Sequence, residues 1–525
     1  MKIQYLNFFF LLLLLSQYSC DKADDDLLEP TPTVPMEIPI EAVLASPVEV
    51  ELNPHGTAPL SARVVITGKE PMIVHFEIDD DQQIQHQTDS FKRDHKFALL
   101  GLKPATINPI IFTFTLDDHS YAKDTVLVET APLPDYLPEV EIIQQQKNEM
   151  EPGLHFCGFS YSKNNAMLSR PFFFDQQGTI RWFLDIEALS TFFYPVKRLQ
   201  NGNLIFGNLE HIYEYDMLGQ EINHWELGDY SQHHEIVEKA DGNLILAVSD
   251  KNLETVNDQI IEIDRNTGAV VQHWDLRAVL DNDRFPILWN SRDWLHVNSV
   301  WYNETDRSLI ISARHQGIFE VTYDNELVWI IAPHNEWGNA GVDGSGPATA
   351  DHLLTAVNEA GEPYPDAVQL GAQRAADFDW SWGQHAVLSG PNGAILSFDN
   401  GFKRNFENNA PATNHSRGVV YRVDEANQTV QQTWEFGKTL GASFYSRNIS
   451  DIDYLPNTGN YLLTSGNVHF EGTASARIFE VSESGTIVFE AKVHFANLYG
   501  NGSDAWGQTD VIYRSERMAL YPDAK

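Results

Sequence analysis

An internal repeat, which begins near Ile142 and runs to the end of the chain, is the feature that most restricts the fold. Two short elements alternate along it. The first is a polar turn followed by a strand with an aromatic residue, and its six copies carry Trp182, Trp225, Trp274, Trp329, Trp434 and Phe489. The second is a tight polar turn that leads into an apolar strand, in QNGNLIFGN, ADGNLILAV, TDRSLIISA, PNGAILSFD, NTGNYLLTS and SERMALYP.

Each repeat unit accounts for roughly four strands, and repeated four-stranded antiparallel units are typical of a β-propeller. Six copies of each element predict six blades. The first aromatic strand precedes any complete blade. We therefore expect residues 170–186 to supply the outer strands of a blade whose inner strands come from residues 510–521. Such a closure joins the two ends of the ring and removes free sheet edges.

The residues before the repeat predict a second, smaller domain. From about residue 41 to residue 129, short β-rich runs such as ARVVITG and IIFTFTL alternate with turn residues, which indicates a small antiparallel sandwich. A Pro-rich break, APLPDYLPEVE, follows it. The sequence thus predicts an all-β protein with an N-terminal β-sandwich over 40–135 and a six-bladed β-propeller over 142–525.

The first residues have the pattern of a targeting segment. Lys2 precedes an apolar stretch over residues 8–15, and Ser19 stands before Cys20. This resembles the signal of bacterial lipoproteins. The resemblance implies a signal peptide over 1–20, a lipid on Cys20, and an acidic, Pro-rich tether over 21–39. We expect a membrane-anchored protein of the cell envelope that faces the periplasm or the cell surface. An ordinary secretory peptide with an incidental cysteine is the alternative.

Charge and cysteine content restrict the partners. The chain has 35 Lys and Arg residues against 74 Asp and Glu residues, a formal charge of −39. Nucleic-acid binding requires clustered cations, so DNA and RNA are excluded as main partners. Only Cys157 remains after Cys20, so an intrachain disulfide in the mature protein is impossible.

The repeat register predicts which side chains point toward the propeller axis. In each unit, the strand before the polar turn is expected to be innermost. Counting back from the apolar strands gives one residue for each blade: Tyr194, His234, His296, His385, Ser450 and Thr509. The position of His296 requires three additional turn residues. Asn298 shares a strand face with His296 because side chains alternate with period two, and Arg314 ends the next strand.

Three histidines and an arginine on one axis predict a functional centre. Three imidazoles could bind zinc with an open fourth position. However, the ring contains no carboxylate, and Arg314 would repel a cation. Because arginine suits a tetrahedral oxyanion, we favour an anion site without a metal. Hydrogen-bonded structural histidines are the simpler interpretation of each residue taken alone.

Three motifs carry a resemblance to a known family. HHEIVEKADGN, DWLHVNSVWYNETDRSLIISARHQ and QHAVLSGPNGAILSFDNG are similar to the bacterial aryl sulfotransferases. That resemblance implies a six-bladed propeller enzyme without a cofactor. It would move a sulfuryl group from an aryl sulfate ester to a phenolic acceptor by a ping-pong reaction through a sulfohistidine, independently of phosphoadenosine phosphosulfate. A noncatalytic ligand-binding envelope propeller and a metal-dependent hydrolase or lactonase stay open as alternatives.

The resemblance also implies roles for individual residues. His385 corresponds to the histidine that becomes sulfated, His296 to an acid or base, and Arg314 and His234 to groups that stabilise the sulfuryl oxygens. His233 competes with His234, which we prefer on the repeat register. The implied substrate-binding residues are Asn298, Tyr194, Ser450 and Thr509. Family members can carry a disulfide, which this chain cannot form.

A long insertion over residues 334–379 separates the third and fourth predicted blades and ends in the aromatic run FDWSW. We expect it to cover one face of the propeller. Trp380 and Trp382 would then be available to stack on aryl rings as a lid or acceptor wall. A homodimer contact or a plain surface loop is the alternative.

Overall fold

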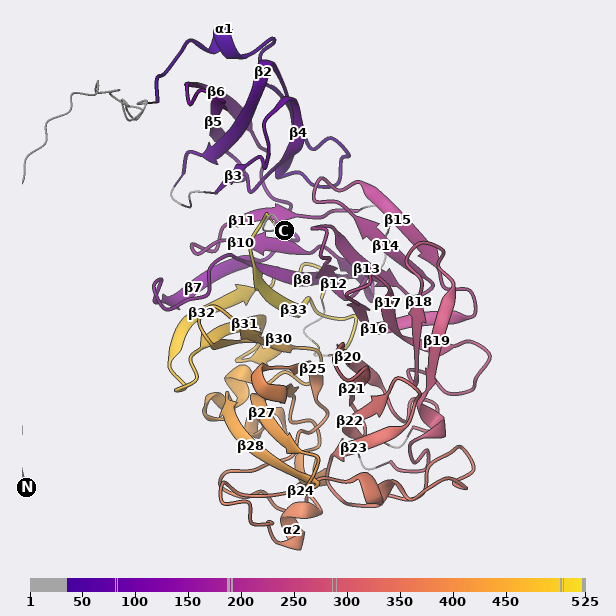
Figure 1. Cartoon of the computed structure of the whole chain (residues 1–525). Coiled ribbons are helices and arrows are strands. Elements are labelled where there is room, and N and C mark those ends of the chain that lie inside the picture. The colour runs from indigo at the N-terminus through magenta and orange to yellow at the C-terminus, as the bar shows by residue number, and fades with distance from the viewer. Residues whose placement is uncertain are drawn as a thin grey trace, which may run out of the picture.

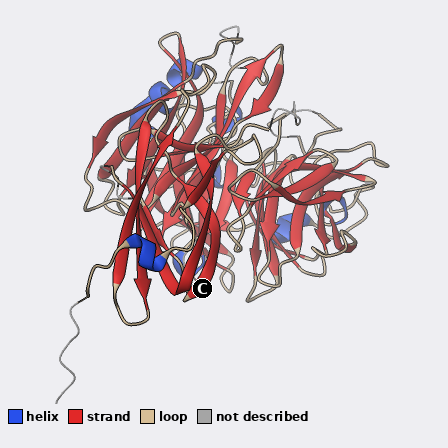
Figure 2. Ribbon diagram, turned by 90° about the horizontal axis from the view of Figure 1, so that it is seen from above, coloured by secondary structure: helices blue, strands red, loops and turns tan. Residues whose placement is uncertain are grey.

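The computed structural model describes residues 35–521, except residues 81, 83, 187, 188, 190, 191, 286, 289, 409, 501, 502 and 504. The expected signal peptide, Cys20 and most of the expected tether lie outside the described residues. A small β domain sits at one side of a ring of β-sheets (Figure 1). The molecule is almost entirely strands and loops, with a few short helical turns (Figure 2). None of the helices within the described residues is long and apolar enough to cross a membrane.

The small domain is organised around one long strand, β2 (Ser61–Ile78). Its first half pairs with β1 (Glu49–Leu52) and β4 (Lys92–Leu100), and its second half with β3 (Gln85–Gln87) and β5 (Ile107–Leu116). β6 (Tyr121–Glu129) pairs with β5, and the short α1 (Ile40–Val43) precedes the sheet. Alternate side chains of β2 such as Val64, Ile66, Val74 and Phe76 are buried, so β2 contributes to the core along its whole length.

Six antiparallel sheets form the ring and confirm the predicted six-bladed propeller. Blades 1 to 3 contain consecutive strands: β12 (Val196–Arg198), β13 (Leu204–Asn208), β14 (His211–Tyr215), β15 (Glu221–Glu226); β16 (Tyr230–Glu238), β17 (Leu244–Asp250), β18 (Gln259–Ile263), β19 (Val270–Asp275); and β20 (Val297–Asn303), β21 (Ser308–Ala313), β22 (Gly317–Thr322), β23 (Leu327–Ile331). Blades 4 and 5 contain β25 (His385–Ser389), β26 (Ala394–Asp399), β27 (Arg417–Asp424), β28 (Thr429–Phe436); and β29 (Asp451–Leu455), β30 (Asn460–Phe470), β31 (Thr473–Val481), β32 (Ile487–His494). The first strand of each blade is innermost, and neighbouring innermost strands contact one another from β16 to β33 (Val511–Met518).

Blade 6 closes the ring with strands from both ends of the repeat. The C-terminal β33 is innermost and pairs with β8 (Leu154–Lys163), which carries β9 (Ala166–Ser169), β10 (Phe172–Phe174) and β11 (Ile180–Phe183). The predicted closure is therefore present. The segment SERMALYP is not the second strand of its blade, because β8 takes that place. β7 (Glu139–Gln145) adds a fifth strand to blade 5.

The repeated aromatic residues lie on the fourth strand of each blade, counted outward from the axis. These strands are β11, β15, β19, β23, β28 and β32. Separate clusters of buried apolar side chains fill the spaces between neighbouring blades. Trp274, for example, is fully buried and packs with Ile245 and Ile260 of its own blade and Ile311 of the next. The aromatic residue recurs in the sequence because each blade needs a large apolar side chain on its fourth strand to pack against its neighbour.

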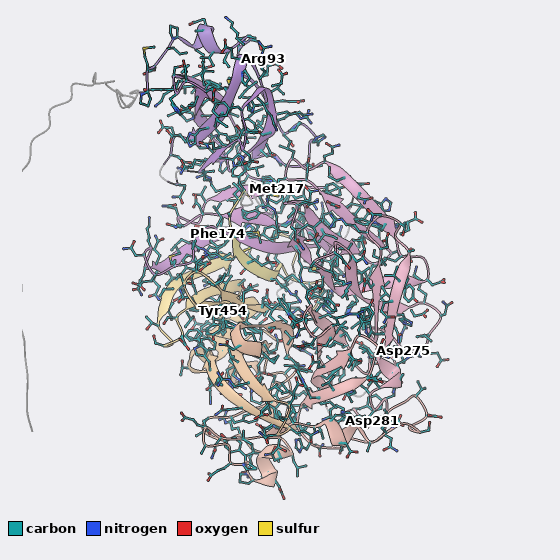
Figure 3. The ribbon with its side chains drawn as sticks, in the orientation of Figure 1. Arg93, Phe174, Met217, Asp275, Asp281 and Tyr454 are labelled. Atoms are coloured by element: carbon teal, nitrogen blue, oxygen red, sulfur yellow. The ribbon has the colours of Figure 1, made fainter. Side chains whose placement is uncertain are left out.

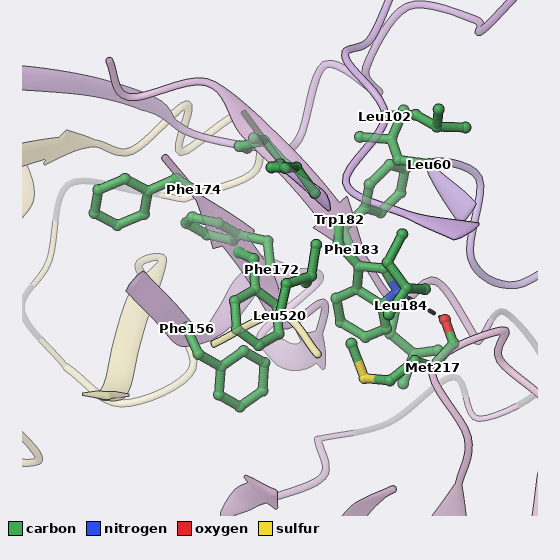
Figure 4. Close-up of a cluster of buried hydrophobic side chains, with 14 of the residues drawn as sticks. Leu60, Leu102, Phe156, Phe172, Phe174, Trp182, Phe183, Leu184, Met217 and Leu520 are labelled. Carbon is green, nitrogen blue, oxygen red and sulfur yellow. Dashed lines mark hydrogen bonds between the residues drawn. The ribbon is translucent and has the colours of Figure 1, made fainter. Parts of the chain in front are cut away.

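One apolar cluster joins the small domain to the propeller. Leu60 and Leu102 of the small domain lie close to Trp182, Leu184 and Met217 of the propeller (Figure 4). The indole nitrogen of Trp182 donates a hydrogen bond of 2.8 Å to the carbonyl of Met217. These contacts attach the small domain to blades 6 and 1.

The contact between the domains also contains a buried charge cluster. Arg181, which is fully buried, forms ion pairs of 2.5 Å with Asp80 and 3.2 Å with Asp175. Its Nε donates to the carbonyl of Gly101 in the small domain. The guanidinium is thus satisfied from both domains.

The insertion over residues 334–379 does not provide an aryl-binding wall. Its β24 (Thr355–Ala356) pairs in parallel with the outermost β28 of blade 4. Trp380 and Trp382 are each 1% exposed and belong to the cluster between blades 3 and 4. Their indole nitrogens donate to Val368 and Asp379. The expectation that they stack on substrate rings is wrong, because both rings are buried between the two blades. Side chains project from the ribbon in every blade of the ring (Figure 3).

Candidate active site

Local irregularities in the innermost strands bring polar side chains toward the axis. The ladder of β16 breaks between Gln232 and Ile236, and the ladder of β25 breaks after His385. His234, His296, Ala386 and Ser450 have positive φ angles of 65°, 58°, 55° and 87°. Such angles are uncommon outside glycine and persist only where the surrounding structure imposes them. These irregular positions lie in or just before the innermost strands of neighbouring blades, and they bring the residues together at the axis.

A cavity of about 470 Å³ lies at this end of the axis. Its lining consists of Tyr194, His233, His234, Leu288, His296, Arg314, His315, His385, Phe402, Arg447, Asn448, Ile449, Ala505 and Trp506. No acidic residue occurs among these described lining residues. The ring centroid of His234 lies 5.1 Å from that of His296 and 5.3 Å from that of His385. The protein carries a large negative charge, yet this cavity suits an anion.

His385 has the geometry of a nucleophile. Its Nδ1 lies 2.9 Å from the carbonyl oxygen of Ser450, which can only accept, so Nδ1 carries the proton. Nε2 then holds a lone pair, and it has no hydrogen-bond partner within the described chain. Burial, helped by the charge of Arg514, holds the pKa of His385 well below its usual value. The imidazole is therefore neutral at neutral pH.

His234 and His296 belong to a hydrogen-bonded chain. The Nε2 atoms of the two rings lie 3.1 Å apart. Nδ1 of His296 lies 2.7 Å from Oδ2 of Asp293, and Nδ1 of His234 lies 2.5 Å from the hydroxyl of Tyr513. Burial, together with the neighbouring His233, keeps the pKa of His234 well below its usual value.

His233 also lines the cavity, so the structure brings both competing histidines into the site. Its ring centroid lies 3.8 Å from that of His234 and 5.2 Å from that of His296. Burial lowers the pKa of His233 to about 3. His233, His234 and His296 have ligand atoms within 4.8 Å of one another, as do Asp293, His296 and His315. Either group could hold a metal ion.

Arg314 supplies a fixed positive charge at the wall of the cavity. Its Nη1 donates to the carbonyl of Gly383 over 3.1 Å, and its Nη2 donates to the carbonyl of Arg447 over 2.7 Å. Burial lowers the pKa of Arg314 only to about 10, so the guanidinium remains charged at neutral pH. Its central carbon lies 5.3 Å from the ring centre of Phe402.

The other predicted site residues occupy different places. Tyr194 lines the cavity. Asn298 is buried and donates 2.7 Å to the carbonyl of Gln384, which fixes the backbone before His385. Ser450 acts through its carbonyl, as described above. Thr509 is buried and lies outside the cavity lining, with its hydroxyl 3.4 Å from the carbonyl of Asp510.

The sequence reasoning missed a layer of charged residues beneath the histidines. Arg514 pairs with Glu235 over 2.8 Å, and Lys197 pairs with the same carboxylate over 2.5 Å. It also missed Asp293 and Tyr513. Asp293 stands three residues before His296 in the motif DWLH, and that spacing could have indicated it. Tyr513 and Arg514 gave no comparable signal, because the repeat register places Thr509, and not Tyr513, at the axis of blade 6.

An apolar wall accompanies the polar groups. Leu288, Phe402, Ala505 and Trp506 line the same cavity, and Trp506 is 45% exposed. Its ring packs edge-on against Phe192 at 5.1 Å. The site therefore combines a surface for a flat apolar group with donors for a small anion.

Two comparisons with known proteins identify the family of the chain. The model of the arylsulfotransferase (ASST) family matches residues 139–509, and that of the arylsulfotransferase Ig-like domain matches residues 49–131. Arylsulfate sulfotransferase AssT of Escherichia coli O6:H1 (strain CFT073) is 26% identical over 89% of this chain and 93% of its own length. The protein of the same name from Lelliottia amnigena is 25% identical over 83% of this chain and 87% of its own.

The similarity to one solved structure is distant. A protein of unknown function from Bacteroides caccae aligns with a TM-score of 0.40 and 9% identity over 69% of this chain and 98% of its own. The assignment therefore rests on the sequence comparisons, whose family models together cover both domains. The chain belongs to the arylsulfotransferase family and is an enzyme that transfers sulfuryl groups.

Proposed function

We propose that the protein moves a sulfuryl group from an aryl sulfate ester to a phenolic acceptor through a sulfohistidine on His385, without phosphoadenosine phosphosulfate. The observation that carries this proposal is the buried Nε2 lone pair of His385, which has no partner in the described chain. It faces a cavity with Arg314 and with no acidic lining residue among those described. A neutral imidazole beside anion-binding donors is suited to nucleophilic attack on a sulfate ester.

In the first half-reaction, Nε2 of His385 attacks the sulfur atom. The N–S bond forms while the bond between sulfur and the aryl oxygen breaks, and the electron pair leaves with the phenolate. As the anionic donor binds, Nε2 of His296 takes up a proton from solvent, and it passes this proton to the departing oxygen. The products are an N-sulfo imidazole on His385 and a free phenol.

Two side chains stabilise the transferring group. The guanidinium of Arg314 and an N–H of His234 would donate to the nonbridging sulfuryl oxygens. Preorganised donors of this kind are worth about 2.7–4 kcal/mol each in the transition state. Phe402 and Trp506 provide the apolar surface for the aryl ring.

The second half-reaction reverses the first with a new phenol. The acceptor oxygen attacks sulfur, its proton goes to Nε2 of His296, and the electron pair of the N–S bond returns to Nε2 of His385. One acid–base residue therefore serves both steps, by microscopic reversibility. The sulfated product leaves as an anion, His296 returns its Nε2 proton to solvent, and the enzyme ends in its starting protonation state.

The test uses purified protein with 4-nitrophenyl sulfate, with and without phenol. We expect a burst of nitrophenolate without acceptor and a mass increase on the peptide that contains His385. His385→Asn should abolish both. The matched control is His119→Asn at an exposed position, which should leave both unchanged. Nitrophenolate release that survives in His385→Asn would disprove the nucleophile assignment.

A metal-dependent hydrolase is the second candidate, and the clustered imidazoles favour it. His233, His234 and His296 could hold one metal ion with an open position. In that case, EDTA should abolish activity and zinc should restore it. Under the sulfohistidine mechanism, EDTA has no effect.

A further inference from the structure

Four side chains from three blades and one loop form a continuous chain of hydrogen bonds. In order, they are Asp293, His296, His234 and Tyr513, with contacts of 2.7, 3.1 and 2.5 Å. Asp293 precedes blade 3, His234 lies on β16 of blade 2, and Tyr513 on β33 of blade 6. In each contact, the position of the proton on one group determines whether its neighbour donates or accepts.

The two ends of the chain determine where its protons lie. The carboxylate of Asp293 can only accept, so Nδ1 of His296 carries a proton. Asp293 is ionised at neutral pH. Burial alone would raise the pKa of Asp293, but hydrogen bonding from His296 lowers it to about 2. The side-chain amide of Asn257 donates 3.0 Å to the other carboxylate oxygen, Oδ1.

A neutral His296 protonated at Nδ1 presents a lone pair at Nε2. The contact between the two Nε2 atoms then requires the proton to be on His234. Nδ1 of His234 is consequently an acceptor, and the hydroxyl of Tyr513 donates to it. The same hydroxyl lies 3.2 Å from the carbonyl of His234, a longer contact than the 2.5 Å to Nδ1. The whole chain is thus ordered in one direction.

We propose that Asp293 and Tyr513 are positioning residues, which fix opposite tautomers on the two histidines so that His296 presents a base and His234 presents a donor to the sulfuryl group. The proposal rests on the proposed function. It also explains why His296 and His234, which have identical side chains, have different roles. When substrate separates the two Nε2 atoms, His296 accepts the proton of the acceptor phenol, and His234 donates to a sulfuryl oxygen.

Asp293→Asn tests one end of the chain. An amide at residue 293 can donate to Nδ1 of His296 and so favours the inverted tautomer, with a proton on Nε2. We expect transfer to phenol to fall by about 10²–10⁴-fold, the usual contribution of a general base. The nitrophenolate burst should fall far less, because nitrophenolate is a good leaving group. Donors with more basic phenols should slow progressively, and Asp293→Glu should recover part of the loss.

Tyr513→Phe tests the other end with little change of shape. It removes the donor to Nδ1 of His234, so that ring is free to take either tautomer. We expect both half-reactions to slow by about tenfold, with no change in their dependence on the leaving group, because His234 then presents its Nε2 proton to the sulfuryl group only part of the time. A loss that depends on the leaving group in Tyr513→Phe, or one independent of it in Asp293→Asn, would overturn the proposal.

A spectroscopic measurement decides the ordering without turnover. In protein labelled with ¹⁵N-histidine and assigned with His234→Gln and His296→Gln, we expect His296 as the Nδ1–H tautomer and His234 as the Nε2–H tautomer. Asp293→Asn should shift the signals of His296. The same tautomer on both rings would refute the proposal, whether or not His385 becomes sulfated.

Discussion

At the scale of single residues, burial sets the chemical state of the site. His233, His234, His315 and His385 all have pKa values held far below the ordinary histidine value, and in each case desolvation is the largest cause. Neutral imidazoles are nucleophiles and acceptors, whereas imidazolium groups are neither. A solvent-accessible cluster of histidines would lose this property below about pH 6.5.

The same burial makes folding sensitive to acid. His315 is 3% exposed, and burial lowers its pKa to about 3 in the presence of its neighbours His296, Asp293 and Arg314. Between about pH 6.5 and pH 3, the unfolded chain binds a proton at residue 315 that the folded chain does not. The free energy of unfolding therefore falls with decreasing pH, by about 1.4 kcal/mol per pH unit for each such histidine.

His315→Asn should make this pH dependence shallower by about 1.4 kcal/mol per pH unit between pH 6 and pH 4. The measurement is the free energy of unfolding from urea titrations across that range. The slope is informative even though the lost hydrogen bond lowers stability at every pH. His119→Asn, at an exposed position, is the control and should leave the slope unchanged. An unaltered slope in His315→Asn would contradict the assignment of a buried neutral imidazole.

At the scale of the element, each blade combines two functions. In blades 2 to 5, positive-φ positions in or just before the innermost strand present polar groups to the axis, while the outer strands carry the large apolar residues that pack against the next blade. The strained positions are tolerated because the outer strands hold the sheet. Function and stability are thus separated along the radius of each blade.

Two positions on β19 test this separation. Trp274 is fully buried between blades 2 and 3, so Trp274→Ala should lower the free energy of unfolding by about 3–5 kcal/mol. Val271, on the same strand, is 54% exposed, and Val271→Ala should change it by less than about 0.5 kcal/mol. Thermal and urea unfolding provide the comparison. Equal effects of the two substitutions would refute the packing argument.

At the scale of the whole molecule, closure of the ring joins stability to the site. β33 completes blade 6 by pairing with β8, roughly 350 residues earlier in the chain. The same strand delivers Tyr513 to His234 and Arg514 to Glu235. Without it, blade 6 would present an unpaired strand edge, and the histidines would lose a neighbour.

A chain that ends at residue 510 tests this role. We expect its thermal midpoint to fall by more than about 10 °C, because several buried apolar residues and a complete strand are lost. Aryl sulfate turnover should be abolished. A separately expressed segment of residues 505–525 should restore both by pairing with β8. A truncated chain with an unchanged midpoint would show that closure contributes nothing to stability.

The sequence alone determined the architecture and much of the site. The six aromatic strands and the polar turns are local patterns, and each records how one strand is buried between blades. They predicted the propeller and its closure, and the motifs placed His234, His296, His385 and Arg314 in what proved to be a single cavity. The motifs and the repeat were sufficient to predict the fold and these four residues, because each motif and each repeat unit lies within one blade.

Tertiary structure decided the chemical state of those residues. The proton on His385 depends on a carbonyl in blade 5, and the ordering of His234 depends on Tyr513, 279 residues away. Neither contact leaves a local pattern, because its partners belong to different blades and meet only in the folded ring. For the same reason, Trp380 and Trp382 could not be distinguished from substrate-facing aromatics until the packing of blades 3 and 4 was known. Periodicity reports burial along a strand, whereas the partner of a buried polar atom is set by the arrangement of distant strands.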